Sequence, residues 1–222
     1  MPNILAIETS SDACSVALSF ENEISSFHEI APQKHTEKLF GFIQELMKER
    51  RLKFSQLDAV AVGHGPGSFT GIRLACSVAQ GIAYSAGISA ISISSMEVVA
   101  QYANSKIKQK DIVVLVDAHM KQIYVGRFKF EGEELIYSDE EVVLVQKFLD
   151  SNFDSKSCFI GGGCKLVEKK LSKLNSPIYD DHYPNAVDLL SLAQRRFITG
   201  QIMRPEEVLP VYLSGKEHWT KG

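Results

Sequence analysis

The chain has 222 residues, of which 45% are hydrophobic and 23% are charged, and its formal net charge is −3. This hydrophobic content excludes an intrinsically disordered chain, and the slightly acidic balance argues against a protein that binds nucleic acid or membrane over most of its surface. No apolar run approaches the roughly 18 residues of a membrane span, and the four cysteines show no C-x-x-C spacing. We therefore expect a cytoplasmic protein with reduced cysteines and no membrane association.

Apolar runs bounded by turn-rich clusters predict strands in the first half of the chain, and an apolar period of about 3.6 residues predicts helices. Ser68 is the expected N-cap of one helix, and Gly87 its end. Ser94 and Glu97 have the spacing of a capping box that opens another helix. The predicted elements, in chain order, are strands at 3–8, 14–20 and 24–30, a helix at 35–51, a strand at 59–63, a helix at 69–86, a strand at 88–93 and a helix ending at 104.

The second half repeats this order of elements without obvious residue identity. Its predicted elements are strands at 112–116, 123–130 and 135–144, a helix at 146–153, a strand at 158–160, a basic helix at 164–174, a short strand at 177–179 and a helix at 186–199. Equivalent elements are about 105–110 residues apart, so we predict two α/β subdomains, each a mixed sheet covered by helices. The predicted bounds are 1–104 and 105–204, followed by a tail at 205–222 that packs back on the body.

Five segments of the chain resemble one family. They are I-L-A-I-E-T-S at 4–10, A-V-G-H-G-P-G-S-F-T-G-I-R at 61–73, G-I at 87–88, S-S-M-E at 94–97 and L-P-V-Y-L at 209–213. In this order they resemble the TsaB family, the non-catalytic partners of TsaD in the bacterial threonylcarbamoyladenosine modification of ANN-decoding tRNAs. The resemblance implies the two-domain fold of actin, the sugar kinases and the Hsp70-like ATPases (the ASKHA fold), which agrees with the duplicated βββαβαβα pattern.

The resemblance also bears on catalysis. TsaD-like sequences carry H-M-E-G-H, in which two histidines on one helix face bind a metal. The aligned stretch here is Ser95-Met96-Glu97-Val98-Val99, so neither ligand position holds a residue that coordinates a transition metal usefully. This difference implies a chain without metal and without catalytic residues. The alternatives that stay open are an autonomous ATP-binding enzyme and a metallopeptidase-like hydrolase of the same superfamily.

The helix at 69–86 carries small residues at every fourth position, which places them on one face. Either this face packs inside the domain, or it lets a partner helix approach closely while larger flanking side chains cover the sheet. The resemblance favours a partner, because TsaB pairs with TsaD through its first two long helices, and it predicts a homodimer through the same helices when TsaD is absent. The predicted contact set on 35–51 and 69–86 is Leu39, Phe42, Ile43, Leu46, Gly71, Ala75, Ala79 and Ala83.

Residual nucleotide binding is a further prediction from the actin-like resemblance. Small hydroxyls and backbone N–H groups in loops between strands can hold an anion, although a glycine triplet is equally typical of a plain strand-to-helix turn. If hydrolysis occurs, Glu8 and Asp117 are the candidate magnesium-side carboxylates. The candidate phosphate-loop residues are Thr9, Ser10, Asp117, Gly161, Gly162 and Gly163.

The resemblance implies partners rather than cofactors. We expect this chain to require no cofactor, with ATP used by the complex and bound directly only weakly. TsaD is the expected direct partner, TsaE acts through the complex, and tRNA is met indirectly. The lysines of the 164–174 helix indicate a solvated face, with contact to a tRNA backbone as the alternative.

Overall fold

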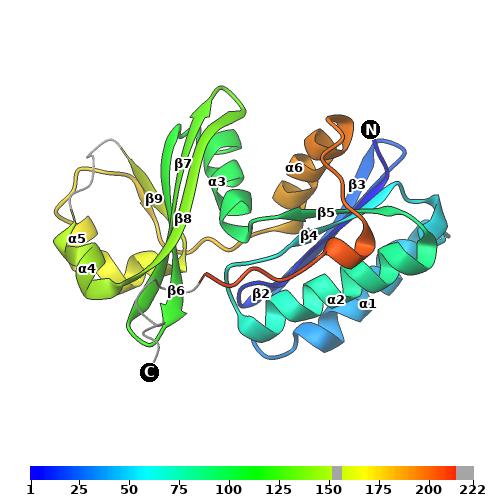
Figure 1. Ribbon diagram of the computed structural model, residues 1–222, viewed down its shortest axis with the longest axis horizontal. Coiled ribbons are helices and arrows are strands. Elements are labelled where there is room, and N and C mark those ends of the chain that lie inside the picture. The colour runs from blue at the N-terminus through cyan, green and yellow to red at the C-terminus, as the bar shows by residue number, and fades with distance from the viewer. Residues whose placement is uncertain (152–156, 214–222) are drawn as a thin grey trace. The chain divides into compact units, whose positions relative to one another are not determined.

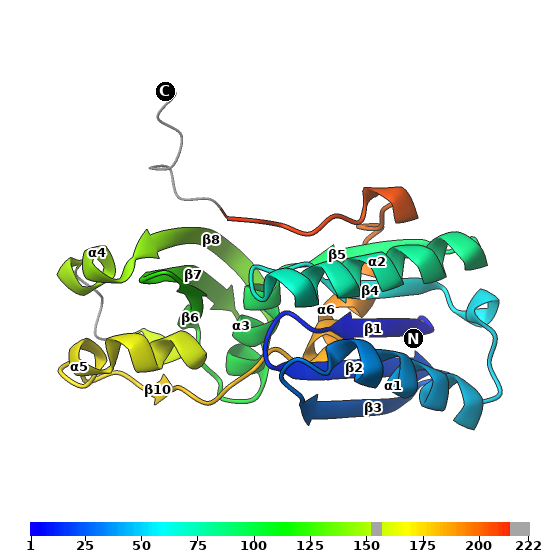
Figure 2. The same cartoon turned by 90° about the horizontal axis from the view of Figure 1, so that it is seen from below.

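The computed structural model describes residues 1–151 and 157–213. These residues form two compact units: residues 1–98 with 184–211 make up unit 1, and residues 99–183 with 212–213 belong to unit 2. Figures 1 and 2 show the two units as separate sheets with their helices. None of the described helices combines the length and the apolar character needed to cross a membrane.

Unit 1 is a five-stranded mixed sheet in the order β3-β2-β1-β4-β5. The central strand β1 pairs antiparallel with β2 and parallel with β4. Its elements are β1 (Ile4–Glu8), β2 (Ala13–Phe20), β3 (Glu23–Ile30), α1 (His35–Glu49), η1 (Phe54–Gln56), β4 (Ala59–Gly63), α2 (Phe69–Ala86), β5 (Ser89–Ile93), the start of α3 (Ser95–Ser105), α6 (Ala186–Ile198) and η3 (Pro205–Glu207).

Both faces of this sheet are covered, which explains why β1 reads as an unbroken apolar run. Successive side chains of a strand point to opposite faces. Leu5 and Ile7 accordingly pack in one core cluster with α1 and α2, whereas Ile4 and Ala6 pack in another with α6. Figure 1 shows α1 and α2 below the sheet of unit 1 and α6 above it. The last long helix of the chain, α6, therefore covers one face of the first sheet.

Unit 2 repeats the same strand order, β8-β7-β6-β9-β10. The helices α4 and α5 and the turn η2 cover one face of this sheet, in a cluster that includes Leu115, Phe148 and Phe159. Its elements are the later part of α3, β6 (Asp111–His119), β7 (Gln122–Glu131), β8 (Glu134–Leu144), α4 (Val145–Asp150), β9 (Cys158–Ile160), η2 (Gly162–Val167), α5 (Glu168–Leu171) and β10 (Ile178–Tyr179). The predicted duplication is confirmed: each unit is an α/β unit built on a five-stranded mixed sheet with the same strand order.

Two sequence predictions differ from the structure. The prediction of a basic helix at 164–174 is wrong. In the structure, a 3₁₀ turn, Gly162–Val167, leads into a helix of only four residues, Glu168–Leu171. One of its lysines, Lys170, does not extend a solvated stripe, because its ammonium donates to the backbone carbonyls of Phe148, Leu149 and Ser151 at the end of α4. The unit bounds also differ from 1–104 and 105–204, since α6 packs on the first sheet and 184–211 belong to unit 1.

The segment that follows α6 packs back on unit 1. Met203 forms an antiparallel bridge with Ala90 on the outer edge of β5. Val208 is 2% exposed and belongs to the cluster beneath α2, and the Val211 N–H donates to the His64 carbonyl at 3.0 Å. The first part of the predicted tail, 205–211, therefore packs on the body, while residues 214–222 lie outside the part of the chain that the structure describes.

The packing of α6 on the first sheet yields a stability prediction. Leu189 is fully buried against that sheet, so Leu189→Ala should lower the free energy of unfolding by about 2–5 kcal/mol in urea denaturation. Ile198, on the same helix, is 74% exposed, and Ile198→Ala should change it by less than about 0.5 kcal/mol. Equal effects of the two substitutions would contradict this packing.

Candidate functional site

A buried carboxyl group occupies the carboxyl end of β1. Glu8 is fully buried; its Oε1 accepts from the Ser10 N–H at 2.7 Å, and its Oε2 accepts from the Ser95 hydroxyl at 2.9 Å. A Cβ at Gly63, on the neighbouring strand β4, would lie 1.7 Å from Oε2. Only a glycine at this position leaves room for the carboxyl group.

Glu8 is stabilised in this place by neutral donors. Burial raises the pKa of the Glu8 carboxyl above its ordinary value of 4.5, and the hydrogen bonds from Ser10 and Ser95 lower this pKa only in part. A magnesium-side carboxylate has to reach the ion and its water ligands. A fully buried group with both oxygens accepting internal hydrogen bonds is unsuited to that role.

The first predicted phosphate loop is also engaged internally. Thr9 and Ser10 are 0% and 3% exposed. The Thr9 hydroxyl donates to the Gly71 carbonyl at 2.8 Å, and the Ser10 carbonyl accepts from the Ser68 N–H at 2.7 Å. A Cβ at Gly71 would lie 2.0 Å from the backbone carbonyl oxygen of Thr9. The structure thus brings a predicted phosphate residue and a predicted partner-contact residue together, in one close contact between β1 and α2.

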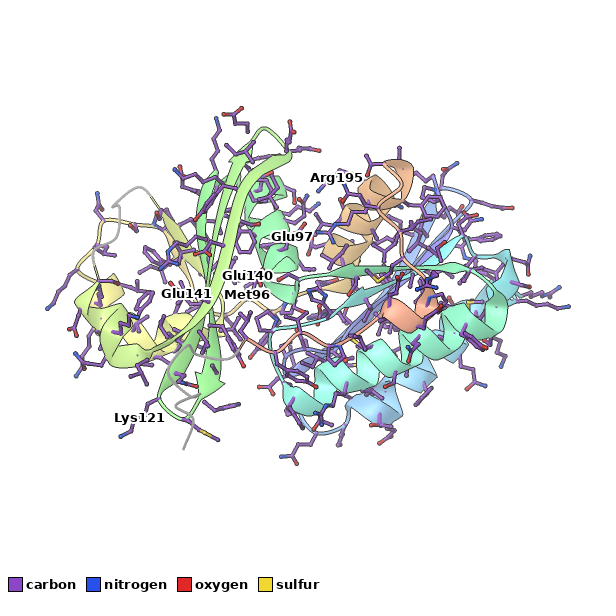
Figure 3. The ribbon with its side chains drawn as sticks, viewed as in Figure 1. Met96, Glu97, Lys121, Glu140, Glu141 and Arg195 are labelled. Carbon is purple, nitrogen blue, oxygen red and sulfur yellow. The ribbon has the colours of Figure 1, made fainter. Side chains whose placement is uncertain are left out.

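A second network lies beside the G-P-G loop, at the ends of β4 and β5. The Nδ1 atom of His64 lies 2.8 Å from the Ser92 hydroxyl. The Arg196 guanidinium donates to the Ser92 carbonyl at 2.7 Å and to the Glu97 carboxylate at 2.6 Å; Figure 3 labels Glu97 on α3. Burial, and secondarily the charge of Arg196, lowers the pKa of His64 to about 4. His64 is therefore neutral at physiological pH.

The other candidate phosphate residues belong to unit 2. The Asp117 side chain is 45% exposed and accepts from the His119 N–H at 2.7 Å. The three residues after Ala118 have positive φ, so the backbone of the β6–β7 connection is left-handed there; Figure 3 shows one of them, Lys121, on this connection. This conformation follows a register shift in β6, and Asp117 acts within it as a turn-forming side chain.

The glycine triplet is explained mainly by packing. A Cβ at Gly161 would lie 2.4 Å from the Leu115 carbonyl oxygen, and one at Gly163 would lie 2.7 Å from the Leu115 carbonyl carbon. Gly161 also has φ of +108°. Gly162 is exposed, and a Cβ there would meet no atom within 4 Å. The first and third glycines therefore allow close approach to β6, and only the second is open to solvent.

The metal positions of TsaD-like sequences are filled by packed residues. Ser95 is 3% exposed and bonds to Glu8, and Val99 is 2% exposed. Met96, labelled in Figure 3, is fully buried in its place on α3. Across residues 1–151 and 157–213, no group of three or more His, Cys, Asp or Glu side chains is arranged to hold a metal ion.

The structure places nearly all of the predicted partner-contact set in the core of unit 1. The predicted aliphatic and alanine residues on α1 and α2 are at most 4% exposed and pack in the core of unit 1. Phe42 is half-buried, and its ring stacks on that of Phe27 with 4.9 Å between centroids. The small row on α2 lets the helix approach its own sheet. The residues of the set that lie in the core are Leu39, Ile43, Leu46, Ala75, Ala79 and Ala83, and Gly71 is buried against Thr9.

The opposite side of the same two helices is exposed. We call it the outer helix face. Phe40 is 53% exposed, Phe69 56% and Tyr84 75%, and each lies off the apolar stripe that packs on the sheet. This displacement from the stripe is the sequence signal that could have identified them. The outer helix face comprises Phe40, Gly41, Gln44, Phe69, Arg73, Ser77, Gly81 and Tyr84.

Two features make the outer helix face suitable for contact. The Arg73 guanidinium lies 3.5 Å from the centroid of the Phe69 ring, in a cation–π contact. A Cβ at Gly41 or Gly81 would meet no atom within 4 Å, so the helix surface is low at these points. At Tyr84 the face continues into a groove of about 580 Å³ whose other wall is 202–207.

The burial of Glu8 generates a pH prediction. Because its folded-state pKa is raised, the folded protein binds this proton more tightly than the unfolded chain, and the free energy of unfolding falls as pH rises from 4.5 through the raised pKa. Glu8→Gln has no such titration. Urea denaturation should therefore show the variant gaining stability relative to the natural chain as pH rises above 4.5 and through the raised pKa. A pH-independent difference between the two would contradict the raised pKa.

The chain is similar in sequence to known proteins. The family model described as "TsaD: tRNA N6-adenosine threonylcarbamoyltransferase" matches residues 21–177. A relative from Haemophilus influenzae named tRNA threonylcarbamoyladenosine biosynthesis protein TsaB is 31% identical over 98% of this chain and 96% of its own length. The Escherichia coli protein of the same name is 29% identical over 98% of this chain and 97% of its own length.

Solved structures extend the similarity to three dimensions. A Pseudomonas aeruginosa structure described as a protein with similarity to peptidase YeaZ superposes with a TM-score of 0.86 at 31% identity, covering 96% of this chain and 100% of that chain. A second structure from this organism, described as YeaZ, has a TM-score of 0.84 at 32% identity with the same coverage. Similarity of this extent in sequence and in structure shows that the chain belongs to the TsaB (YeaZ) family of tRNA threonylcarbamoyladenosine biosynthesis proteins.

Proposed function

We propose that this chain is a non-catalytic subunit that pairs with TsaD for threonylcarbamoyladenosine modification of ANN-decoding tRNAs. The observation that carries the proposal is the burial of Glu8 at the carboxyl end of β1. Glu8 is fully buried and its carboxyl group is held by Ser10 and Ser95, and the metal-ligand positions hold Ser95 and Val99. Catalysis then falls to the partner, and this chain acts by binding it.

The composition of the outer helix face supports a protein partner. Aromatic residues and arginine are the types most often found at the energetic centre of protein interfaces, and Phe69 and Arg73 are stacked before any partner arrives. Gly81 and Ser77 lie one turn apart on exposed positions of α2. Small residues at this spacing let a partner helix approach near the short end of the usual ~8–10 Å range.

The same face supports the other proposed assemblies. When TsaD is absent, an isologous homodimer would use the outer helix face of both copies, because a self-complementary patch pairs about a twofold axis. TsaE is then reached through the complex, and tRNA is met indirectly. This chain requires no cofactor on this proposal: ATP is used by the complex in the cytoplasm, and direct binding to this chain is weak.

The contact face can be tested by a substitution that the monomer tolerates. Gly81 has open space at its Cβ, so Gly81→Arg should fold normally and place a long charged side chain between the helices. Calorimetric titration with TsaD should show affinity at least about tenfold weaker, equivalent to about 1.4 kcal/mol.

Ile198→Arg is the matched control, since it adds the same charge at a 74% exposed position on α6, which covers the other side of the sheet. Its affinity for TsaD should equal that of the natural chain. Equal binding by Gly81→Arg and Ile198→Arg would refute the placement of the interface.

The function itself is tested by reconstitution. A mixture of TsaD, TsaE, threonylcarbamoyl-adenylate, ATP and unmodified tRNA should form threonylcarbamoyladenosine only when this chain is added, because TsaD lacks its activating partner without it. Mass spectrometry of the digested tRNA measures the product. Full modification in the absence of this chain would overturn the proposal.

A further inference from the structure

The Glu8 carboxyl group is linked to both ends of the G-P-G loop. Through Oε2 it accepts from the Ser95 hydroxyl, and the Ser95 oxygen accepts from the Gly65 N–H at 3.2 Å. The Ser95 N–H also donates to the Gly65 carbonyl at 2.9 Å. Two hydrogen bonds with Ser95 therefore hold Gly65 at one end of the loop, and a third joins Ser95 to Glu8.

The other end of the loop is held through Ser10. Glu8 Oε1 accepts from the Ser10 N–H, and the Ser10 carbonyl accepts from the N–H of Ser68. Ser68 is the N-cap of α2, and its hydroxyl accepts from the Gly71 N–H at 3.3 Å. The first turn of α2 is thus linked to the Glu8 carboxyl group. Ser10 and Ser95, which both bond to this group, also bond to the N-cap of α2 and to the loop before it.

The outer side of this turn is part of the outer helix face. Gly71 and Ile72 are buried, whereas Ser68, Phe69, Thr70 and Arg73 are exposed. The stacked Phe69 and Arg73 side chains therefore stand on a turn whose inner side is fixed to the ends of β1 and β5. A contact of this kind depends on orientation, since a displacement of the turn moves both side chains together.

We propose that Glu8 and Ser95 are positioning residues for partner docking, which hold the first turn of α2 so that Phe69 and Arg73 meet TsaD in one orientation. The inference rests on the proposed function. It assigns to the buried carboxyl a role in binding that needs no contact with substrate, nucleotide or metal. Preorganised side chains bind with a smaller loss of conformational freedom, so loosening the turn weakens docking even though the contacting residues are unchanged.

The experiment compares TsaD affinity by calorimetry for purified full-length variants, at a temperature where circular dichroism shows each to be folded. Ser95→Ala removes the hydroxyl that joins Glu8 to Gly65 and should weaken binding about tenfold. Glu8→Ala should weaken it further. Glu8→Gln should restore affinity to within about threefold of the natural chain, because its amide accepts from Ser10 and donates to Ser95.

Leu189→Ala is the matched control for stability, since it destabilises unit 1 from the opposite face of the sheet. It should bind TsaD as tightly as the natural chain. A second readout is amide hydrogen exchange in the isolated variants: Ser95→Ala should speed exchange at Ser68, Gly71 and Ile72 about tenfold, with no change along α6.

The outcomes separate the inference from the proposed function. Natural affinity in Ser95→Ala and Glu8→Ala, with binding still weakened in Gly81→Arg, would overturn the positioning role and leave the proposed function intact. Unchanged exchange at Ser68 and Gly71, or equal weakening by Leu189→Ala and Ser95→Ala, would also overturn it. Failure of the natural chain to bind TsaD would overturn both.

Discussion

A carboxyl group buried among neutral hydrogen-bond donors is the constraint on which the arrangement of unit 1 depends. A polar group taken out of water costs free energy unless its hydrogen bonds are replaced, and Glu8 is fully buried at the end of the central strand. The chain satisfies it with one backbone N–H and one hydroxyl, from Ser10 and Ser95. These two residues in turn bond the G-P-G loop and the N-cap of α2. Residues of the signature 65–71 are thus bonded to the neighbours of one buried carboxyl group.

The helix α2 has a buried side and an exposed side. Its small residues face inward, where Ala75, Ala79 and Ala83 let the helix lie close to β1 and β4. Its outward side carries Phe69 and Tyr84, which are more than half exposed. A helix packed this closely on a sheet is already ordered, so little conformational entropy is lost when a partner binds it. The packing of α2 on the sheet thus both buries the residues at the carboxyl end of β1 and leaves the outer side of the helix exposed.

Sequence patterns predicted the order of elements because each signal is local. Ser68 and Gly87 mark the ends of α2 as predicted, and apolar runs mark every central strand. Patterns failed where the answer depends on distant parts of the chain. The periodicity of α6 cannot show which sheet it covers, and the lysines of 164–174 cannot show that Lys170 bonds to the end of α4. A row of small residues is compatible with a sheet or with a partner, and only the structure shows that it faces the sheet. Thr9 and Ser10 are predicted as phosphate-loop residues, and no local pattern shows that contacts with Gly71 and Ser68 bury them.

Site-specific photo-crosslinking tests the central claim most directly. A benzoyl-phenylalanine in place of Tyr84, on the outer helix face, should crosslink to TsaD on irradiation of the mixture, and the same group in place of Ile198, on α6, should not. Mass spectrometry of the product identifies the joined peptides. Crosslinks from position 84 to a helix of TsaD are the predicted result. Crosslinks from position 198 alone, or none from either position despite stable binding, would contradict the account.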